Sequence, residues 1–372
     1  MDPPALHVTV PVPGCESRFR SEHESTHTAP PPITASRAPC SADHWAHIVV
    51  AVRPPIYRLA IGALQYLRRV AVVVTAVLSL VVIGSTAPLL PTLAVLRASI
   101  AAAPTEKVLP SVTDPPLEQV WTGIDATELH GQKGCGNVGG DSADITSEVP
   151  CTFGDRSATR TVVVVGDSMA GAWVPTLDVW GQAEHWKIVR LVKDGCPPWT
   201  TATRAPTCVA FRSFEVRTIN ALRPKAVFAV GLQDRGQVTM ETTKPAVVAA
   251  TIERFALEVR TSRARVLVPQ NTPWFFGIGS PVQCLAAYPG TVQKCNRDAR
   301  TKVVEPAMLS GITIAAAAHR IVEVPVDQLF CGPTICPVLV GDHIVYADDH
   351  HFSKVWAIYI SRAFAAVFDP LV

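Results

Sequence analysis

The sequence predicts an α/β protein, a three-layer α/β/α sandwich with a parallel sheet between two helix layers, preceded by a single transmembrane helix. From residue 161 onward, short strand-like runs alternate with helix-like stretches. This alternation is typical of βαβ units, which build a parallel sheet covered on both faces. Upstream, residues 70–96 contain no charged side chain, and about 20 apolar residues suffice to span a bilayer.

The composition fits a globular protein with a membrane segment. Of the 372 residues, 48% are hydrophobic and only 17% are charged. Lys and Arg total 33 and Asp and Glu total 31, so the net charge is +2. This balance gives no indication of a nucleic acid partner.

Residues 1–69 are expected to form a cytoplasmic, largely disordered region. Residues 1–44 are rich in Pro, Ser, Thr and His and have little apolar periodicity, so they cannot bury enough surface to offset the entropy of ordering. Residues 48–67 are moderately apolar and fit either an interfacial helix or a loop with a short helix.

The predicted anchor, residues 70–96, also predicts the orientation of the chain. Four arginines precede it between residues 53 and 69, whereas only Arg97 and Lys107 follow closely. This bias predicts a single-pass protein of the cell membrane with a cytoplasmic N-terminus and an extracytoplasmic C-terminal part. The alternative is a signal peptide cleaved near residues 101–103, although such peptides usually have about 15–30 residues.

The ten cysteines divide into two groups. Eight lie beyond the predicted anchor in four neighbouring couples: Cys135 and Cys151, Cys196 and Cys208, Cys284 and Cys295, Cys331 and Cys336. An even number in an oxidising compartment indicates disulfides, and pairing within each couple is the simplest connectivity. Zinc binding is the alternative, although no Cys-x-x-Cys pair is present. Cys15 and Cys40 would remain free on the cytoplasmic side.

Residues 97–134 are expected to be a linker, and residues 135–372 to form the folded domain. The expected strands cover residues 161–165, 187–192, 225–230, 265–268 and 321–324. The expected helices cover residues 170–184, 209–222, 245–261 and 303–318, with a final amphipathic helix at residues 354–368.

The first expected strand leads into a candidate nucleophile. Four consecutive valines, residues 162–165, are typical of a strand buried on both faces. Gly166 allows a sharp turn, and Ser168 falls where the next helix begins. A serine at this position lies at the carboxyl edge of the sheet, where α/β proteins place their chemistry. The alternative is an ordinary Asp-Ser helix cap.

Asp348 and His351, just before the last helix, are expected to complete a catalytic triad with Ser168. Ser168 would be the nucleophile, His351 the general base, and Asp348 the group that orients the imidazole. The helix start would offer N–H groups to a developing oxyanion. The alternatives are a surface loop, a metal site, or an exchange of roles between His350 and His351.

Gly166-Asp-Ser168 together with Asp348-x-x-His351 resembles the SGNH hydrolase (GDSL esterase/lipase) superfamily. More specifically, the sequence is similar to the extracytoplasmic SGNH domain often fused to membrane acyltransferase 3 proteins. The similarity runs from Cys135 to the C-terminus and is carried by residues 151–155, 165–175, 193–197, 331–341 and 346–353. It implies an SGNH/flavodoxin-like sandwich and a role in the O-acylation of cell-envelope glycans.

The resemblance also implies an oxyanion hole and reveals two departures from the family pattern. Gly195 matches the glycine whose N–H group helps to form the hole. The family places an asparagine after the third strand, where residues 231–234 offer only the amide of Gln233. Met169 stands where related domains often have histidine, and it would either reshape the acyl pocket or simply pack.

These observations predict a membrane-anchored serine esterase or O-acyltransferase that acts on acyl esters, chiefly acetyl esters, of an envelope polysaccharide or glycolipid. No cofactor or metal is expected. A single predicted span is not expected to carry acyl groups across the membrane. A transferase would therefore need a separate multi-pass membrane acyltransferase as its partner. The departures at Met169 and Gln233 favour the alternative of an inactive glycan-binding or partner domain, and metal-dependent hydrolysis is a third hypothesis.

Overall fold

The computed structural model describes residues 90–121, 151–199, 206–231, 244–270, 272–273, 279–299 and 306–372. The chain divides into two compact units, Met1–Gly84 and Ser85–Val372, and all described elements belong to the second. Among the described helices, none has both the length and the apolar character needed to cross a membrane. Residues 70–89, which make up most of the predicted anchor, lie outside the described ranges.

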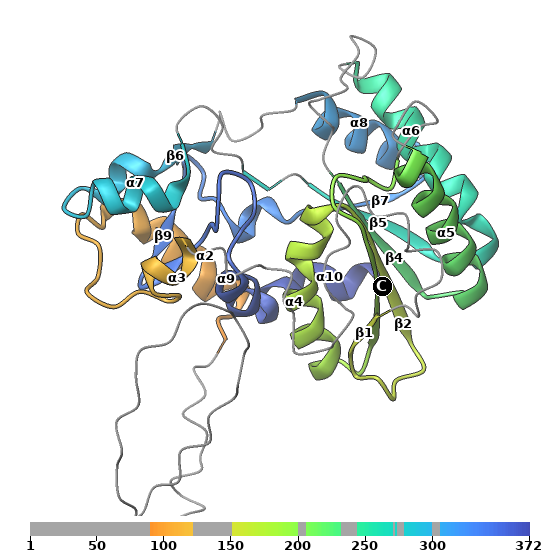
Figure 1. The fold of residues 1–372 in the computed structure, drawn as a ribbon, viewed down its shortest axis with the longest axis horizontal. Helices are drawn as coiled ribbons and strands as arrows, with labels where there is room; N and C mark the ends of the chain where they lie inside the picture. Colours follow the sequence, from red (N-terminus) through yellow and green to blue (C-terminus); the bar gives the residue numbers. More distant parts are fainter. Residues whose placement is uncertain are drawn as a thin grey trace, which may run out of the picture. The chain divides into compact units, whose positions relative to one another are not determined.

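A six-stranded, mostly parallel sheet forms the centre of the folded unit (Figure 1), with the strand order β1-β3-β2-β4-β5-β7. The strands are β1 (Cys151–Gly154), β2 (Thr161–Gly166), β3 (Lys187–Val192), β4 (Ala226–Val230), β5 (Arg265–Pro269) and β7 (Val322–Val324). The last five are parallel, as predicted. β1, however, pairs antiparallel with β3 and was not predicted. Its four residues include only one buried side chain, Phe153, which is too little for a strand pattern.

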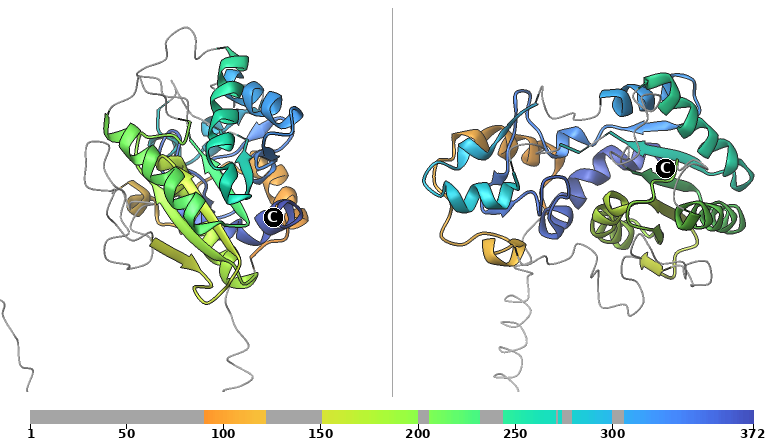
Figure 2. Two further views of the ribbon diagram at one scale, coloured as in Figure 1. Left: turned by 90° about the vertical axis from the view of Figure 1, so that its right-hand side faces the viewer. Right: turned by 45° about the horizontal axis from the view of Figure 1, so that its top comes forward.

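Helices cover both faces of this sheet (Figures 1 and 2). One face packs against α4 (Ser168–Ala183) and α10 (Ser361–Phe368), and the other against α5 (Pro206–Leu222), α6 (Pro245–Glu258) and α8 (Pro306–Ala317). Successive side chains of a strand point to opposite faces. Val162 and Val164 therefore belong to one core, and Val163 and Val165 to the other. Two covered faces explain why this strand has four valines in succession.

The predicted helices agree with the structure to within a few residues, except at the C-terminus. There, the expected helix at residues 354–368 is broken at Ile360 into α9 (Lys354–Tyr359) and α10. Trp356, Ile360 and Phe364 are all fully buried in the same core. The four-residue spacing of these apolar positions continues through the junction, so the sequence pattern contains no sign of the break.

Part of the predicted anchor and linker belongs to the folded unit. α2 (Leu93–Ala102) begins after Thr92, whose side chain accepts a hydrogen bond from the Val95 N–H. Leu96 and Ile100 on this helix are 0% and 1% exposed and join the core that contains α10. The 3₁₀ helix η1 (Ala103–Thr105) and α3 (Leu117–Trp121) follow. The folded unit therefore begins on the N-terminal side of the expected boundary at residue 135.

The remaining elements are short, and most of them were not predicted. They are α7 (Pro281–Ala287), the strand pairs β6 (Arg297–Asp298) with β8 (Ile335–Cys336) and β9 (Leu339–Val340) with β10 (His343–Ile344), and the 3₁₀ helices η5 (Arg260–Ser262), η6 (Val292–Cys295), η8 (Asp327–Leu329) and η9 (Asp369–Leu371). Such elements are too short to show periodicity.

Three of the predicted disulfides are present within the described residues. They join Cys196 to Cys208, Cys284 to Cys295, and Cys331 to Cys336. Cys151 is also disulfide-bonded, and its predicted partner, Cys135, lies outside the described ranges. Pairing between sequence neighbours is thus confirmed for three couples.

Candidate active site

A turn that only glycine can form separates β2 from α4. Gly166 has a φ of +138°, a region that L side chains rarely adopt. A Cβ atom at this position would lie 1.6 Å from the carbonyl oxygen of Val230 on the neighbouring strand. The backbone of β2 therefore turns directly against β4, and this turn places Ser168 as the first residue of α4.

The start of α4 lies where parallel α/β sheets usually bind ligands. Asp167 caps the helix, and its carboxylate accepts a hydrogen bond of 3.0 Å from the Met169 N–H. β2 has β3 on one side and β4 on the other, so the chain leaves β2 at the point where the strand order reverses. A crevice forms outside the carboxyl ends of strands at such a switch point.

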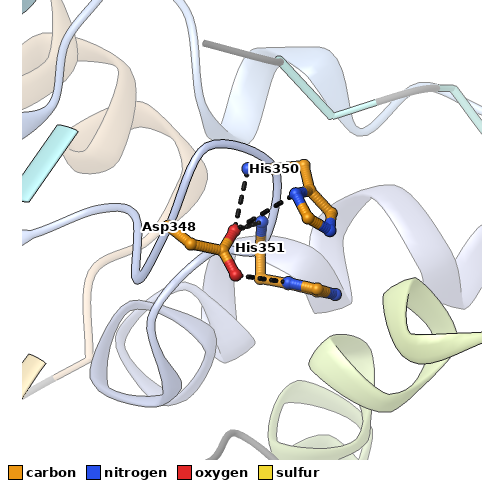
Figure 3. A group of neighbouring side chains, drawn as sticks. All are labelled: Asp348, His350 and His351. Carbon is orange, nitrogen blue, oxygen red and sulfur yellow. Dashed lines mark hydrogen bonds and ion pairs between the residues drawn. The ribbon is translucent and has the colours of Figure 1, made fainter. Parts of the chain in front are cut away.

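The loop before α9 is shaped by the carboxylate of Asp348 (Figure 3). Its Oδ1 atom accepts hydrogen bonds from the backbone N–H groups of His350, at 2.8 Å, and His351, at 2.6 Å. Its Oδ2 atom lies 2.7 Å from Nδ1 of the His351 ring. One side chain thus both shapes the loop and orients the imidazole.

The structure brings together the three residues of the predicted triad. Nε2 of His351 lies 2.8 Å from Oγ of Ser168, although the two residues are 183 positions apart in the sequence. Together with the Asp348 contact, this forms a continuous Ser–His–Asp hydrogen-bonded chain. In this arrangement an imidazole can take a hydroxyl proton while a carboxylate stabilises the resulting imidazolium.

Electrostatics agree with this geometry. Burial raises the pKa of Asp348, but the hydrogen bond from His351 and the charges of His351 and His350 outweigh it, so the pKa falls to about 2. Burial lowers the pKa of His351, yet the hydrogen bond and charge of Asp348, with Asp167 and Asp194 nearby, raise it above 6.5. Asp348 is therefore ionised at neutral pH and favours a proton on His351.

His350 makes different contacts. Its Nδ1 atom pairs with Asp349 and lies 3.4 Å from Oδ1 of Asp348, and its ring lies against that of His351, tilted by 43° with the centroids 4.0 Å apart. Ligand atoms of Asp348, His350 and His351 lie within 4.8 Å of one another, as a metal site would require. Both ring nitrogens of His351 are already engaged, however. The geometry therefore favours the Ser–His–Asp chain over metal ligation, and His351 rather than His350 as the histidine beside Ser168.

The predicted oxyanion residues are only partly within the described ranges. Gly195 follows β3 by three residues and has a φ of +66°. Because Gly166 pairs with Val192, the two glycines lie beyond the same edge of the sheet. Gly195 is exposed, and a Cβ atom there would meet nothing within 4 Å, so its surroundings are open. Gln233 lies outside the described ranges.

A small cavity adjoins the start of α4. About 10 Å³ in size, roughly the room for one water molecule, it is lined by Met169, Trp173, Trp199, Val230, Gly231, Pro269, Gln270 and Thr272. Met169 is 3% exposed and thus both packs and lines the cavity. Trp199 Nε1, Gln270 Oε1 and Thr272 Oγ1 are buried and have no hydrogen-bond partner in the described part of the structure. No sequence pattern indicated Gln270 or Thr272, which follow β5 in a loop.

A buried acid on α5 also supports the turn and was not predicted. Glu215 is 1% exposed. Burial raises the pKa of its carboxyl well above the usual range, although Arg212 and the Gly166 N–H group lower it. The Gly166 N–H group thus lies close to this buried carboxyl, whose Oε1 atom has no hydrogen-bond partner in the described part of the structure. An acidic residue on a helix is usually solvated, so its sequence position did not indicate this contact.

The fold and this site define an α/β protein of the SGNH hydrolase class. The chain belongs to the family described as "SGNH domain (fused to AT3 domains)", whose profile matches residues 135–366.

Several solved structures are similar to this chain. The lipopolysaccharide acetyltransferase periplasmic domain of Salmonella ser. Paratyphi A shares 13% identity with a TM-score of 0.45, over 58% of this chain and 84% of that one. TesA shares 16% with a TM-score of 0.33, over 57% and 100%. A GDSL-like lipase from Bacteroides thetaiotaomicron shares 12% with a TM-score of 0.32, over 57% and 89%. No curated protein matches the chain significantly.

Proposed function

We propose that this protein is a membrane-anchored serine esterase or O-acyltransferase that acts on acyl esters of cell-envelope glycans. The observation that carries the proposal is the continuous hydrogen-bonded chain from Ser168 through His351 to Asp348. Membership of a family whose domains are fused to AT3 domains supports acyl chemistry.

In the proposed reaction, His351 Nε2 takes the proton of Ser168 as Oγ attacks the carbonyl carbon of the ester. The N–H groups of Ser168 and Gly195 would hold the oxyanion. When the intermediate collapses, the C–O bond to the sugar breaks, and His351 returns the proton to the departing hydroxyl. The acyl group remains on Ser168 until an acceptor attacks with the same help from His351. Water as acceptor makes the enzyme an esterase, and a sugar hydroxyl makes it a transferase.

The proposed acyl group is a short one, with acetyl as the first candidate. The proposed substrate is an acetylated polysaccharide or glycolipid.

The proposed location is the extracytoplasmic face of the cell membrane, with the N-terminus in the cytoplasm. The excess of arginines before residue 70 supports this orientation, as do the disulfides of the folded unit, which persist in oxidising compartments. A transferase in this position would receive its acyl groups from a multi-pass membrane acyltransferase.

The test uses the full-length chain in a neutral detergent with p-nitrophenyl acetate and a fluorophosphonate probe. We expect acetate release and covalent labelling, and a loss of at least about 10³-fold in both rates in Ser168→Ala. Both rates should fall by a comparable factor in His351→Ala, because the imidazole is the base for the same step. Folded wild-type protein that neither reacts nor labels would favour the inactive glycan-binding or partner domain. Activity that survives in Ser168→Ala but is abolished by a chelator would favour metal-dependent hydrolysis.

A further inference from the structure

Basic residues occupy the start of every parallel strand, at the edge of the sheet opposite the nucleophile. Lys187 and Arg265 are the first residues of β3 and β5, and Arg160 and Lys225 immediately precede β2 and β4. Arg320 lies two residues before β7. We call these five residues, Arg160, Lys187, Lys225, Arg265 and Arg320, the cationic edge.

The register of the sheet places these residues side by side. The Lys187 N–H group donates to the carbonyl of Arg160, and the Arg265 N–H group donates to that of Lys225. β5 pairs with β7, and Arg265 and Arg320, at the starts of these strands, line the same groove. Neighbouring strands are about 4.8 Å apart, so the row across five strands extends about 19 Å.

A groove lies at one end of this row. With a volume of about 360 Å³, it is lined by residues from α6, the turn before β5, and the start of β7. Four of its lining residues are arginines, Arg260, Arg263, Arg265 and Arg320, and Glu253 is its single carboxylate. The charge lining the groove is thus strongly positive.

These arginines are available to a partner. All four are exposed, and within the described part of the chain none forms an ion pair with a carboxylate. Arg265 donates a hydrogen bond to the backbone carbonyl of Leu371. This bond does not neutralise the positive charge of the guanidinium group. Like charges gathered in this way repel one another, and an anionic partner would relieve that repulsion.

We infer that the cationic edge and its groove bind a linear polyanion, a polymer that carries repeated carboxylate or phosphate groups. Guanidinium groups match both anions in a two-pronged geometry, and a row of about 19 Å is longer than one small anion can contact. A hollow between arginines admits a chain, whereas a flat bilayer would touch only the side chains that protrude around it. A chain is therefore favoured over an anionic membrane surface.

This surface is separate from the candidate active site. β2 has six residues, so the amino and carboxyl edges of the sheet are about 20 Å apart. A polyanion bound at the cationic edge would leave Ser168 free, and it would hold the protein on an anionic polymer while the other edge acts. The inference does not depend on the proposed catalytic activity.

The test measures binding of the full-length chain in neutral detergent to polygalacturonate, to inorganic polyphosphate and to uncharged dextran, at several salt concentrations. The variant combines Arg260→Gln, Arg263→Gln and Arg320→Gln. A matched control removes three exposed cations elsewhere, through Lys244→Gln, Lys294→Gln and Arg362→Gln. Thermal unfolding checks that each variant is folded.

We expect salt-sensitive binding to at least one polyanion and none to dextran. The triple variant should bind at least tenfold more weakly at low salt, and its dependence of log affinity on log salt should be shallower by about 3. The control should bind as wild type does, and the stronger of the two polyanions would identify carboxylate or phosphate as the ligand. Equal binding by wild type and the folded triple variant would overturn the inference. So would the absence of binding to both polyanions.

Discussion

Asp348 performs two tasks with a single carboxylate. One oxygen accepts the N–H groups of His350 and His351 and shapes the loop, and the other orients the ring of His351. The conformation of the loop and the protonation of the base are therefore linked through one residue. Replacing Asp348 by Asn removes the charge but keeps an oxygen that can accept the N–H groups, so an experiment can separate the two tasks.

The raised pKa of His351 leads to a prediction about pH. A general base must be neutral, so we expect kcat/KM to increase with pH through a pKa above 6.5 and then to level off. In Asp348→Asn the amide oxygen can still accept the loop N–H groups, but the negative charge that raises the pKa is lost. The midpoint should move to lower pH, and the plateau should fall by about 10²–10⁴-fold.

The measurement is kcat/KM for p-nitrophenyl acetate between pH 5 and 9, with Asp349→Asn as the matched control. Asp349 pairs with His350, and in the described part of the chain no hydrogen bond or ion pair joins it to His351, whose raised pKa has other causes, so its variant should keep the wild-type midpoint. A midpoint that does not move in Asp348→Asn would contradict the role given to this carboxylate.

Gly166 offers a second test at the residue scale. A methyl group there would collide with the Val230 carbonyl, so we expect Gly166→Ala to lower the free energy of unfolding by more than about 3 kcal/mol. Gly195→Ala is the control, because its φ is also positive but its surroundings are open, and it should cost about 1–2 kcal/mol. Denaturant unfolding measures both. An equal loss of unfolding free energy in the two variants would show that the collision with Val230 is not what makes Gly166→Ala costly.

At the scale of elements, α2 is the segment whose role changes most between sequence and structure. Val70–Leu96 were expected to cross the membrane, with a linker following. In the structure a new helix begins at Leu93, and its buried side chains complete the core beside α10. Leu93–Leu96, the end of the predicted anchor, are therefore part of a helix of the folded unit.

Truncating one buried side chain of α2 tests this role. Leu96→Ala should lower the free energy of unfolding by about 2–4 kcal/mol, because Leu96 is 0% exposed. Val95→Ala, on the same helix but 54% exposed, should change it by less than about 0.5 kcal/mol. Denaturant unfolding of the full-length chain in neutral detergent provides the comparison. No difference between the two variants would mean that α2 contributes no packing to the unit.

At the scale of the whole molecule, the sheet has two chemically different edges. Ser168 and Gly195 lie beyond the carboxyl ends of the strands, whereas the five cations of the cationic edge stand at the amino ends. All five strands run in the same direction, so every strand contributes to both edges. A single sheet can therefore separate a candidate catalytic face from a candidate docking face.

The cysteines allow a prediction for the whole chain. If the folded unit is extracytoplasmic and the N-terminal region is not, eight of the ten cysteines pair, and Cys15 and Cys40 stay free. Protein purified without reductant and then denatured should therefore show two thiols per chain with a thiol reagent. The same sample should show ten after reduction. Ten thiols before reduction would contradict an oxidising location.

The sequence was sufficient to predict the five parallel strands and most of the helices around them. Buried strands and amphipathic helices have local patterns, such as the valines at 162–165 followed by Gly166, because each residue's burial repeats with the period of its own element. Ser168, Asp348 and His351 could be proposed in the same way, since a turn after a strand and a loop before a helix place them at the sheet edge.

Only the tertiary structure decided which long-range contacts these residues make. The bond between His351 and Ser168 joins positions 183 residues apart, and the burial of Glu215 and Leu96 depends on helices packing from elsewhere in the chain. Likewise, the cationic edge is invisible in sequence because its members are separated by 27 to 55 residues and become neighbours only through strand register. Periodicity records the environment of a segment, whereas contacts between distant segments depend on how the sheet orders its strands.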